Sequence, residues 1–297
     1  MSHTRATIMV ALGASLWGTT GTVAYLISDT VSAVTVGAIT MGVGGVVLAL
    51  LGGRRALALW ANPSLRPVLL AGAAAVTAYP LAFYTGMSLA GVAVGNIVAL
   101  ATGPLVGAVL EWRLERDPPG ATWWWALLVG VAGVIVLATG ERELTTADPT
   151  LWPVGLGLSL LAGVAYGTFS YCLSRIIRTG ASSLSATGAV FGAGAVPLLV
   201  VMVTQLSSLQ WEASSVTGLG YLVTGPMVIS YLLYGQGLTH LSSSVVLVIA
   251  LVEPAVATLL AVGVVGERFG PLGIAGLVAI TIAVVLAARA RTMRQRH

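Results

Sequence analysis

Ten long apolar runs follow one another along this 297-residue chain, and they constrain its fold more than any motif does. A membrane core of about 30 Å needs roughly 20 consecutive apolar residues in one helix. The runs are continuous rather than alternating, which argues against the strands of a membrane β-barrel. The sequence therefore predicts an all-α membrane protein with ten transmembrane helices, at Thr7–Ile27, Ala33–Leu51, Pro67–Leu89, Val92–Leu110, Thr122–Thr139, Leu151–Leu173, Ser182–Val203, Val216–Leu238, Ser243–Val265 and Pro271–Ala288.

Composition excludes several classes of protein. Only 8% of the residues are charged, whereas a soluble domain carries about 25%. All 14 basic residues are arginine, so the chain has no lysine for a Schiff base or a Walker A loop. Cys172 is the single cysteine, and His3, His240 and His297 form no metal-binding or protease motif. We expect no catalytic residue, no cofactor and no metal.

The arginines predict the orientation of the spans. With the N-terminus in the cytoplasm, twelve arginines lie inside and only Arg142 and Arg268 lie outside. This positive-inside bias predicts that both termini are cytoplasmic. It also accounts for the net charge of +4 without a nucleic-acid partner. The arginines expected inside are Arg5, Arg54, Arg55, Arg66, Arg113, Arg116, Arg175, Arg178, Arg289, Arg291, Arg294 and Arg296.

Tryptophan supports the same spans. Seven of the eight tryptophans lie at or near predicted span ends, as in the aromatic belts of membrane proteins. Trp17 is the exception, because it lies at the centre of the first span.

The chain repeats itself with a shift of about 150 residues. Because each half has five spans, the second half enters the membrane from the opposite side. The sequence thus predicts two inverted-topology five-helix repeats, residues 1–145 and 146–297, a recurring plan of secondary transporters that bind substrate between the repeats. The matching positions are Trp17-Gly18-Thr19 with Tyr166-Gly167-Thr168, Tyr84 with Tyr234, Pro104 with Pro254, and Glu115-Arg116 with Glu267-Arg268.

These features together resemble the drug/metabolite transporter superfamily, and within it the EamA-type bacterial exporters. The second half matches best, through Glu253-Pro254 and Gly266-Glu267-Arg268, whereas Thr102-Gly103-Pro104 in the first half lacks the acidic residue. The resemblance implies export of amino acids or related small metabolites across the bacterial cytoplasmic (inner) membrane. Since the repeat already supplies both halves, we expect a monomer whose partners are a small-molecule substrate and membrane lipid.

A small solute in the bilayer requires polar and aromatic side chains at mid-depth. Trp17 offers an indole N–H and a π face for a substrate ammonium group. Tyr79 precedes Pro80, whose freed carbonyl needs protein or a cavity around it. Each residue could instead be core packing, and an asparagine could join helices. The candidate substrate-binding residues are Trp17, Tyr79, Phe83, Asn96, Tyr166, Ser170, Tyr231 and Tyr234.

Glu253 is the one carboxylate deep within a predicted span. Ionisable groups in a membrane are costly and indicate function by default. Three hypotheses remain open for it: a proton-coupling group, a contact for substrate ammonium, and a structural acceptor beside the break at Pro254.

The sequence supports other functions less well. An intramembrane enzyme would need converging nucleophile and base or metal ligands, and the sequence shows none. An exporter of organic cations or drugs is the main alternative, because aromatic rings and one carboxylate suit a cation. A nucleotide-sugar or lipid transporter is a third alternative, but a phosphorylated substrate would need basic residues inside the membrane, and the arginines lie near the span ends. The energy source, whether uniport, proton antiport or exchange, is left open.

Overall fold

The computed structural model describes residues 2–28, 30–140, 150–206, 211–260, 263 and 271–289. Regular structure in these ranges is entirely helical. Among the described residues, nine segments are long and apolar enough to cross a membrane, and a tenth, within α5, is a shorter apolar helix. The predicted all-α membrane fold is confirmed. Its elements are α1 (His3–Leu26), α2 (Ala33–Trp60), α3 (Arg66–Ala90), α4 (Val92–Glu115), α5 (Ala121–Gly140), α6 (Trp152–Arg178), α7 (Ser183–Gln205), α8 (Ala213–Leu222), η2 (Val223–Ile229), α9 (Ser230–Leu238), α10 (Ser243–Ile249), α11 (Val252–Leu260) and α12 (Pro271–Arg289).

The same serine cap begins the second helix of each half. Ser32 Oγ accepts a hydrogen bond from the Thr35 amide at 3.3 Å, and Ser182 Oγ accepts one from the Ser185 amide at 3.1 Å. A serine at this position stabilises a helix by about 1 kcal/mol relative to alanine. The two caps are 150 positions apart, so the repeat is present in local structure as well as in sequence.

The second span is longer than predicted. We expected it to end at Leu51, but α2 continues to Trp60 through a kink at Gly53, whose φ is 53°. Glycine tolerates this left-handed conformation. The exposed Arg54 and Arg55 follow directly after the kink, in the last two turns of α2.

The eighth and ninth spans are not single α-helices. The eighth consists of α8, the π-helical segment η2 with Pro226 inside it, and α9. The ninth breaks at Ala250 and Leu251, between α10 and α11 and just before Pro254. Proline lacks an amide hydrogen and clashes with the preceding turn, which disrupts an α-helix. Gly266, Glu267, Arg268 and the expected boundary at 145/146 lie outside the described residues.

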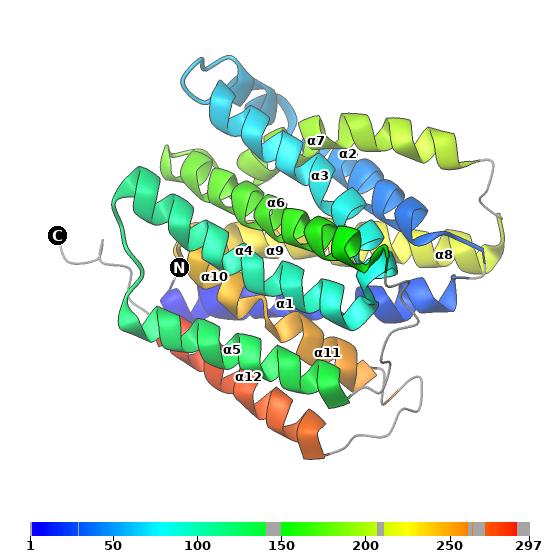
Figure 1. Ribbon diagram of the computed structural model, residues 1–297. Helices are drawn as coiled ribbons and strands as arrows, with labels where there is room; N and C mark the ends of the chain where they lie inside the picture. Colours follow the sequence, from blue (N-terminus) through cyan, green and yellow to red (C-terminus); the bar gives the residue numbers. More distant parts are fainter. Residues whose placement is uncertain are drawn as a thin grey trace.

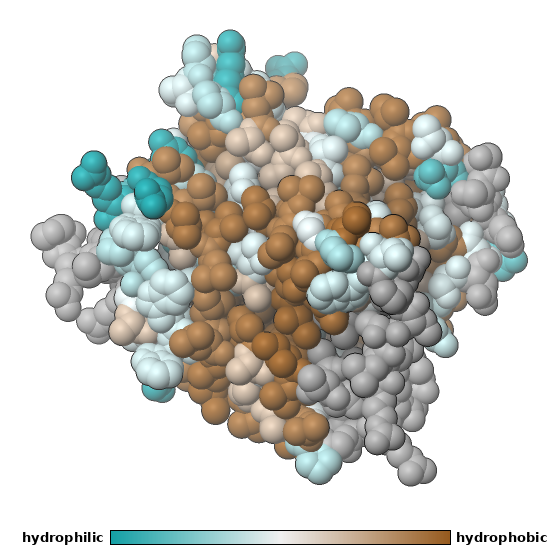
Figure 2. All heavy atoms as spheres, in the orientation of Figure 1, coloured by the Kyte–Doolittle hydropathy of each residue, from teal (hydrophilic) through white to brown (hydrophobic). Residues whose placement is uncertain are grey.

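Polar and apolar surfaces are separated along the bundle. Figure 2 shows hydrophobic residues over the middle of the visible face and hydrophilic residues along its left and upper margins. The nine arginines in the described ranges are all exposed. They lie where α1 and α3 begin and where α2, α4, α6 and α12 end, so successive crossings place them at one end of the bundle, called here the arginine end. Arg142 and Arg268, expected on the opposite side, lie outside the described residues.

Each half packs its first helix against helices of the other half. Figure 1 shows α1 and α6, the first helices of the two halves, running in opposite directions. Helix α1 contacts α9 and α11 of the second half, and α6 contacts α3 and α4 of the first. Helices α2 and α7 pair with each other, as do α5 and α12. Each half therefore inserts its first helix between the third and fourth spans of the other.

Glycines allow the close contacts between the two halves. A Cβ atom added at Gly18 would lie 2.7 Å from the Glu253 carbonyl oxygen and 2.7 Å from Val256 Cβ. A Cβ atom added at Gly167 would lie 2.6 Å from the Gly103 carbonyl oxygen and 2.7 Å from Val106 Cβ. Glycines in membrane helices allow backbones to approach closely. These two crossings are the same contact, made once by each repeat.

Candidate functional site

An aromatic cluster occupies the crossing of the two repeats. Trp17 on α1 lies 5.0 Å from Tyr231 and 5.4 Å from Tyr234, measured between ring centroids. Its ring meets Tyr166 on α6 edge-on at 6.3 Å. These separations are typical of favourable aromatic pairs. The residues that correspond by the repeat, Trp17 and Tyr166, thus contact each other directly.

Helix α3 adds three further rings. Tyr79 lies 5.6 Å from Tyr166 and stacks at 5.3 Å on Phe83, which is one helical turn further along α3. Phe83 in turn contacts Tyr84 at 5.6 Å. Tyr79, Phe83, Tyr166 and Trp17 therefore form one continuous set of rings drawn from three helices.

Sequence reasoning missed three members of this cluster. Phe169 lies 5.4 Å from Tyr166, and Phe191 lies 4.3 Å from Tyr231. Tyr84 was recognised only as the repeat partner of Tyr234. The spacing of Tyr166 and Phe169, three residues apart on α6, could have indicated Phe169. Phe191 comes from α7, and no spacing in the sequence predicts its approach.

The cluster has a buried layer and an accessible layer. Tyr166, Tyr231 and Tyr234 are 3%, 4% and 0% exposed. Trp17, Tyr79, Phe83 and Tyr84 are partly exposed. The cluster therefore combines three buried tyrosines with four partly exposed rings.

Two of the predicted residues are hydrogen-bonded to each other. The Tyr234 hydroxyl donates a hydrogen bond to Ser170 Oγ at 2.7 Å, and both residues are fully buried. This bond orients the Tyr234 ring against Trp17. The Tyr166 hydroxyl is also buried and interacts with the Tyr234 side chain.

Glu253 lies beside the cluster, at the start of α11. Its carbonyl oxygen contacts α1 at Gly18, the neighbour of Trp17. Its carboxylate is partly buried and within electrostatic range of the hydroxyls of Tyr79, Tyr84 and Tyr166. In the described part of the chain no donor is hydrogen-bonded to this carboxylate.

Asn96 stands apart from the other candidates. It lies on α4, seven residues before Gly103, where an added Cβ atom would lie 2.9 Å from the Tyr166 ring. Seven residues correspond to about 10 Å along a helix. Among the described residues Asn96 makes no ring or hydrogen-bond contact with the cluster, and its buried Oδ1 has no hydrogen-bond partner there.

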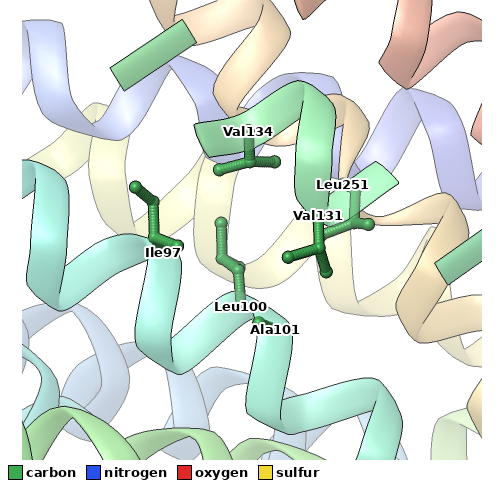
Figure 3. A pocket seen from close by; sticks show the side chains of 6 residues that line it. All are labelled: Ile97, Leu100, Ala101, Val131, Val134 and Leu251. Atoms are coloured by element: carbon green, nitrogen blue, oxygen red, sulfur yellow. The ribbon is translucent and has the colours of Figure 1, made fainter. Parts of the chain in front are cut away.

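A small apolar pocket lies elsewhere. Ile97, Leu100 and Ala101 of α4, Val131 and Val134 of α5, and Leu251 line it, as Figure 3 shows. Its lining offers no side-chain hydrogen-bond donor or acceptor. Specific ligand sites combine apolar walls with a few placed polar groups, so we do not assign this pocket to substrate.

Two oppositely oriented helical repeats with a polar and aromatic centre define the class, which is that of membrane transporters. A model of the EamA-like transporter family matches residues 4–139 and 153–289, and the chain belongs to this family, within the drug/metabolite transporter superfamily. It is a transporter and not an enzyme.

Two known proteins resemble the chain over its length. An uncharacterized transporter, YwfM, of Bacillus subtilis (strain 168) is 28% identical over 292 residues, which cover 93% of each chain. One solved crystal structure superposes with a TM-score of 0.80 over 100% of both chains, at 20% identity. The structural likeness supports the fold.

Proposed function

We propose that the chain exports amino acids or related small metabolites by alternating access, with the solute bound against the aromatic cluster. The main supporting observation is that the rings of Trp17 on α1 and Tyr166 on α6, equivalent positions of the two repeats, lie 6.3 Å apart between centroids. Two similar halves of opposite orientation can exchange conformations, and a site between them then faces each side in turn.

The proposal includes the orientation of the protein in the membrane. The arginine end corresponds to the cytoplasm by the positive-inside rule. The chain then lies in the bacterial inner membrane with both termini in the cytoplasm. Because one chain contains both halves of the site, a monomer suffices for transport.

Organic cations are the second candidate substrates. Every described arginine is exposed and lies near a helix end, so no described cation faces the cluster to pair with a substrate carboxylate. Glu253 and the faces of Trp17 and Tyr79 instead suit an ammonium group, which aromatic rings attract. Transport of amines as well as amino acids follows if the ammonium group is the part recognised.

Uptake into proteoliposomes tests the substrate class. Purified protein is reconstituted, and the uptake of radiolabelled amino acids and of organic cations is measured with and without a proton gradient. We expect at least one amino acid to accumulate faster than in empty liposomes. Transport of cations alone would support the second candidate and reject the first.

Glu253→Gln tests the role of the free carboxylate. If Glu253 carries the coupling proton or contacts the substrate ammonium, the variant should lose most uptake, by about tenfold, since a charge-assisted contact is roughly twice as strong as a neutral one. Initial uptake is measured between pH 5.5 and 8.5. Loss of pH dependence indicates coupling, whereas a raised half-saturation concentration indicates substrate contact. Unchanged uptake with unchanged pH dependence would remove both roles.

A further inference from the structure

A second carboxylate is buried at the arginine end. Glu111, near the end of α4, is 5% exposed. Its Oε1 accepts hydrogen bonds from the Ser243 amide and the Ser243 hydroxyl, both at 2.7 Å, and from the Ser244 amide at 3.3 Å. Its Oε2 accepts a further bond from the Ser244 hydroxyl. Four bonds to one carboxylate thus fasten α4 of the first half to the ninth span of the second half.

The contact between α4 and α10 continues from Glu111 toward the middle of the membrane. A Cβ atom added at Gly107, one turn earlier on α4, would lie 2.8 Å from Leu247 Cδ1. Residues 241–251 are all buried, whereas Val252, Glu253, Ala255, Val256 and Ala257 of α11 are partly exposed. The ninth span is therefore sealed in its arginine-end half and accessible in the half that passes the aromatic cluster. Glu115 and Arg178 add an ion pair of 2.6 Å between α4 and α6 at the same end.

The repeat does not reproduce this contact at the opposite end. A shift of 150 residues relates Glu111 to Ala261, and relates Ser243 and Ser244 to Ala93 and Val94. Neither the carboxylate nor the hydroxyls have counterparts there. At the opposite end the described residues join the two halves through a pair of hydroxyls, Ser215 to Thr30 at 2.7 Å, so among the described residues the buried carboxylate contact is a feature of the arginine end.

We propose that Glu111 is a latch, which holds the arginine end closed through Ser243 and Ser244 and must release them when that end opens. This inference rests on the alternating access of the proposed function. Charge-assisted hydrogen bonds are the stronger kind, and they are worth most where water is excluded. The latch therefore favours the state in which the aromatic cluster is closed to the arginine end.

Cysteine accessibility tests the latch without any substrate. In a Cys172→Ala background, Leu247→Cys places a reporter between α4 and α10, and Val36→Cys places one in α2 near the opposite end; both positions are 1% exposed. The rate of maleimide labelling is measured on purified protein in detergent. Adding Glu111→Gln should accelerate labelling at position 247 by about tenfold, as expected when a charge-assisted bond becomes neutral. Labelling at position 36 should not change.

A double-mutant cycle distinguishes a latch from general packing. Ser243→Ala with Ser244→Ala should raise labelling at position 247 as Glu111→Gln does, and the combination should add little, because the groups act as one unit. Ala108→Cys, at a position 4% exposed, is a smaller change and serves if Leu247→Cys does not fold. Faster labelling at both positions 247 and 36, or at neither, would contradict the proposal that Glu111 is a latch. Since no solute is added, this result is independent of the uptake panel.

Discussion

Replacing Trp17 by alanine should reduce the initial rate of uptake by about tenfold or more. A desolvated cation–π contact is worth about 2 kcal/mol, and the indole also contacts Tyr166, Tyr231 and Tyr234. The variant therefore loses both a face for the solute and the support of three buried rings. Uptake in proteoliposomes measures the effect, with the amount of reconstituted protein held constant.

Trp125 provides the matched control for this change. It is 62% exposed on α5, in the position of a membrane-belt residue. Trp125→Ala removes the same side chain away from the repeat crossing, and its uptake should stay within about twofold of the wild type, because exposed substitutions have small effects. Equal losses from the two alanine variants would show that Trp17 serves the membrane fold in general.

Gly18→Val should destabilise the protein strongly at the contact between α1 and α11. Its Cβ atom would approach the Glu253 carbonyl oxygen to 2.7 Å, and a backbone atom cannot move aside as a flexible side chain can. Overpacking of this kind costs about 1–3 kcal/mol. Gly167→Val should behave alike, since it meets the Gly103 carbonyl oxygen. The melting temperature of the purified protein in detergent checks both.

Gly21→Val is the control for the glycine prediction. Gly21 lies three residues further along α1, and no heavy atom outside its immediate neighbourhood lies within 4 Å of an added Cβ atom. The same substitution there should leave the melting temperature nearly unchanged. If Gly21→Val lowered the melting temperature as much as Gly18→Val, the effect would come from valine in a membrane helix and not from the contact between the repeats.

The ten spans were predictable because each is a local property. A run of about 20 apolar residues needs a helix in a membrane whatever its neighbours are. The breaks were less predictable: Pro226 and Pro254 indicate disruption, but the π-helical form of Val223–Ile229 depends on packing. The kink at Gly53 was read as a helix end, because the glycines and arginines there are typical of a loop.

The candidate site was predictable where the repeat could be used. Trp17 and Tyr166 were singled out as repeat partners, and they contact each other. Tyr231 and Tyr234 were predicted from one helix face and lie against Trp17. Whether these residues bind the solute stays a prediction.

Residues that depend on distant pairing were missed. Glu111 directly follows the predicted end of the fourth span at Leu110, and it was not singled out from the sequence. Its partners, Ser243 and Ser244, are more than 130 positions away in the sequence. No local pattern connects an acidic residue with two serines at that separation.

Substrate protection at the aromatic cluster tests most directly whether the solute binds between the repeats. In a Cys172→Ala background, Phe83→Cys introduces a thiol on the accessible layer, and Ser88→Cys introduces one at an exposed position further along α3. Maleimide labelling is measured with and without solutes that the uptake panel identifies. We predict that transported solutes slow labelling at position 83 and leave position 88 unchanged, while untransported solutes affect neither. Undiminished labelling at position 83 with a transported solute at saturation would contradict the proposed site.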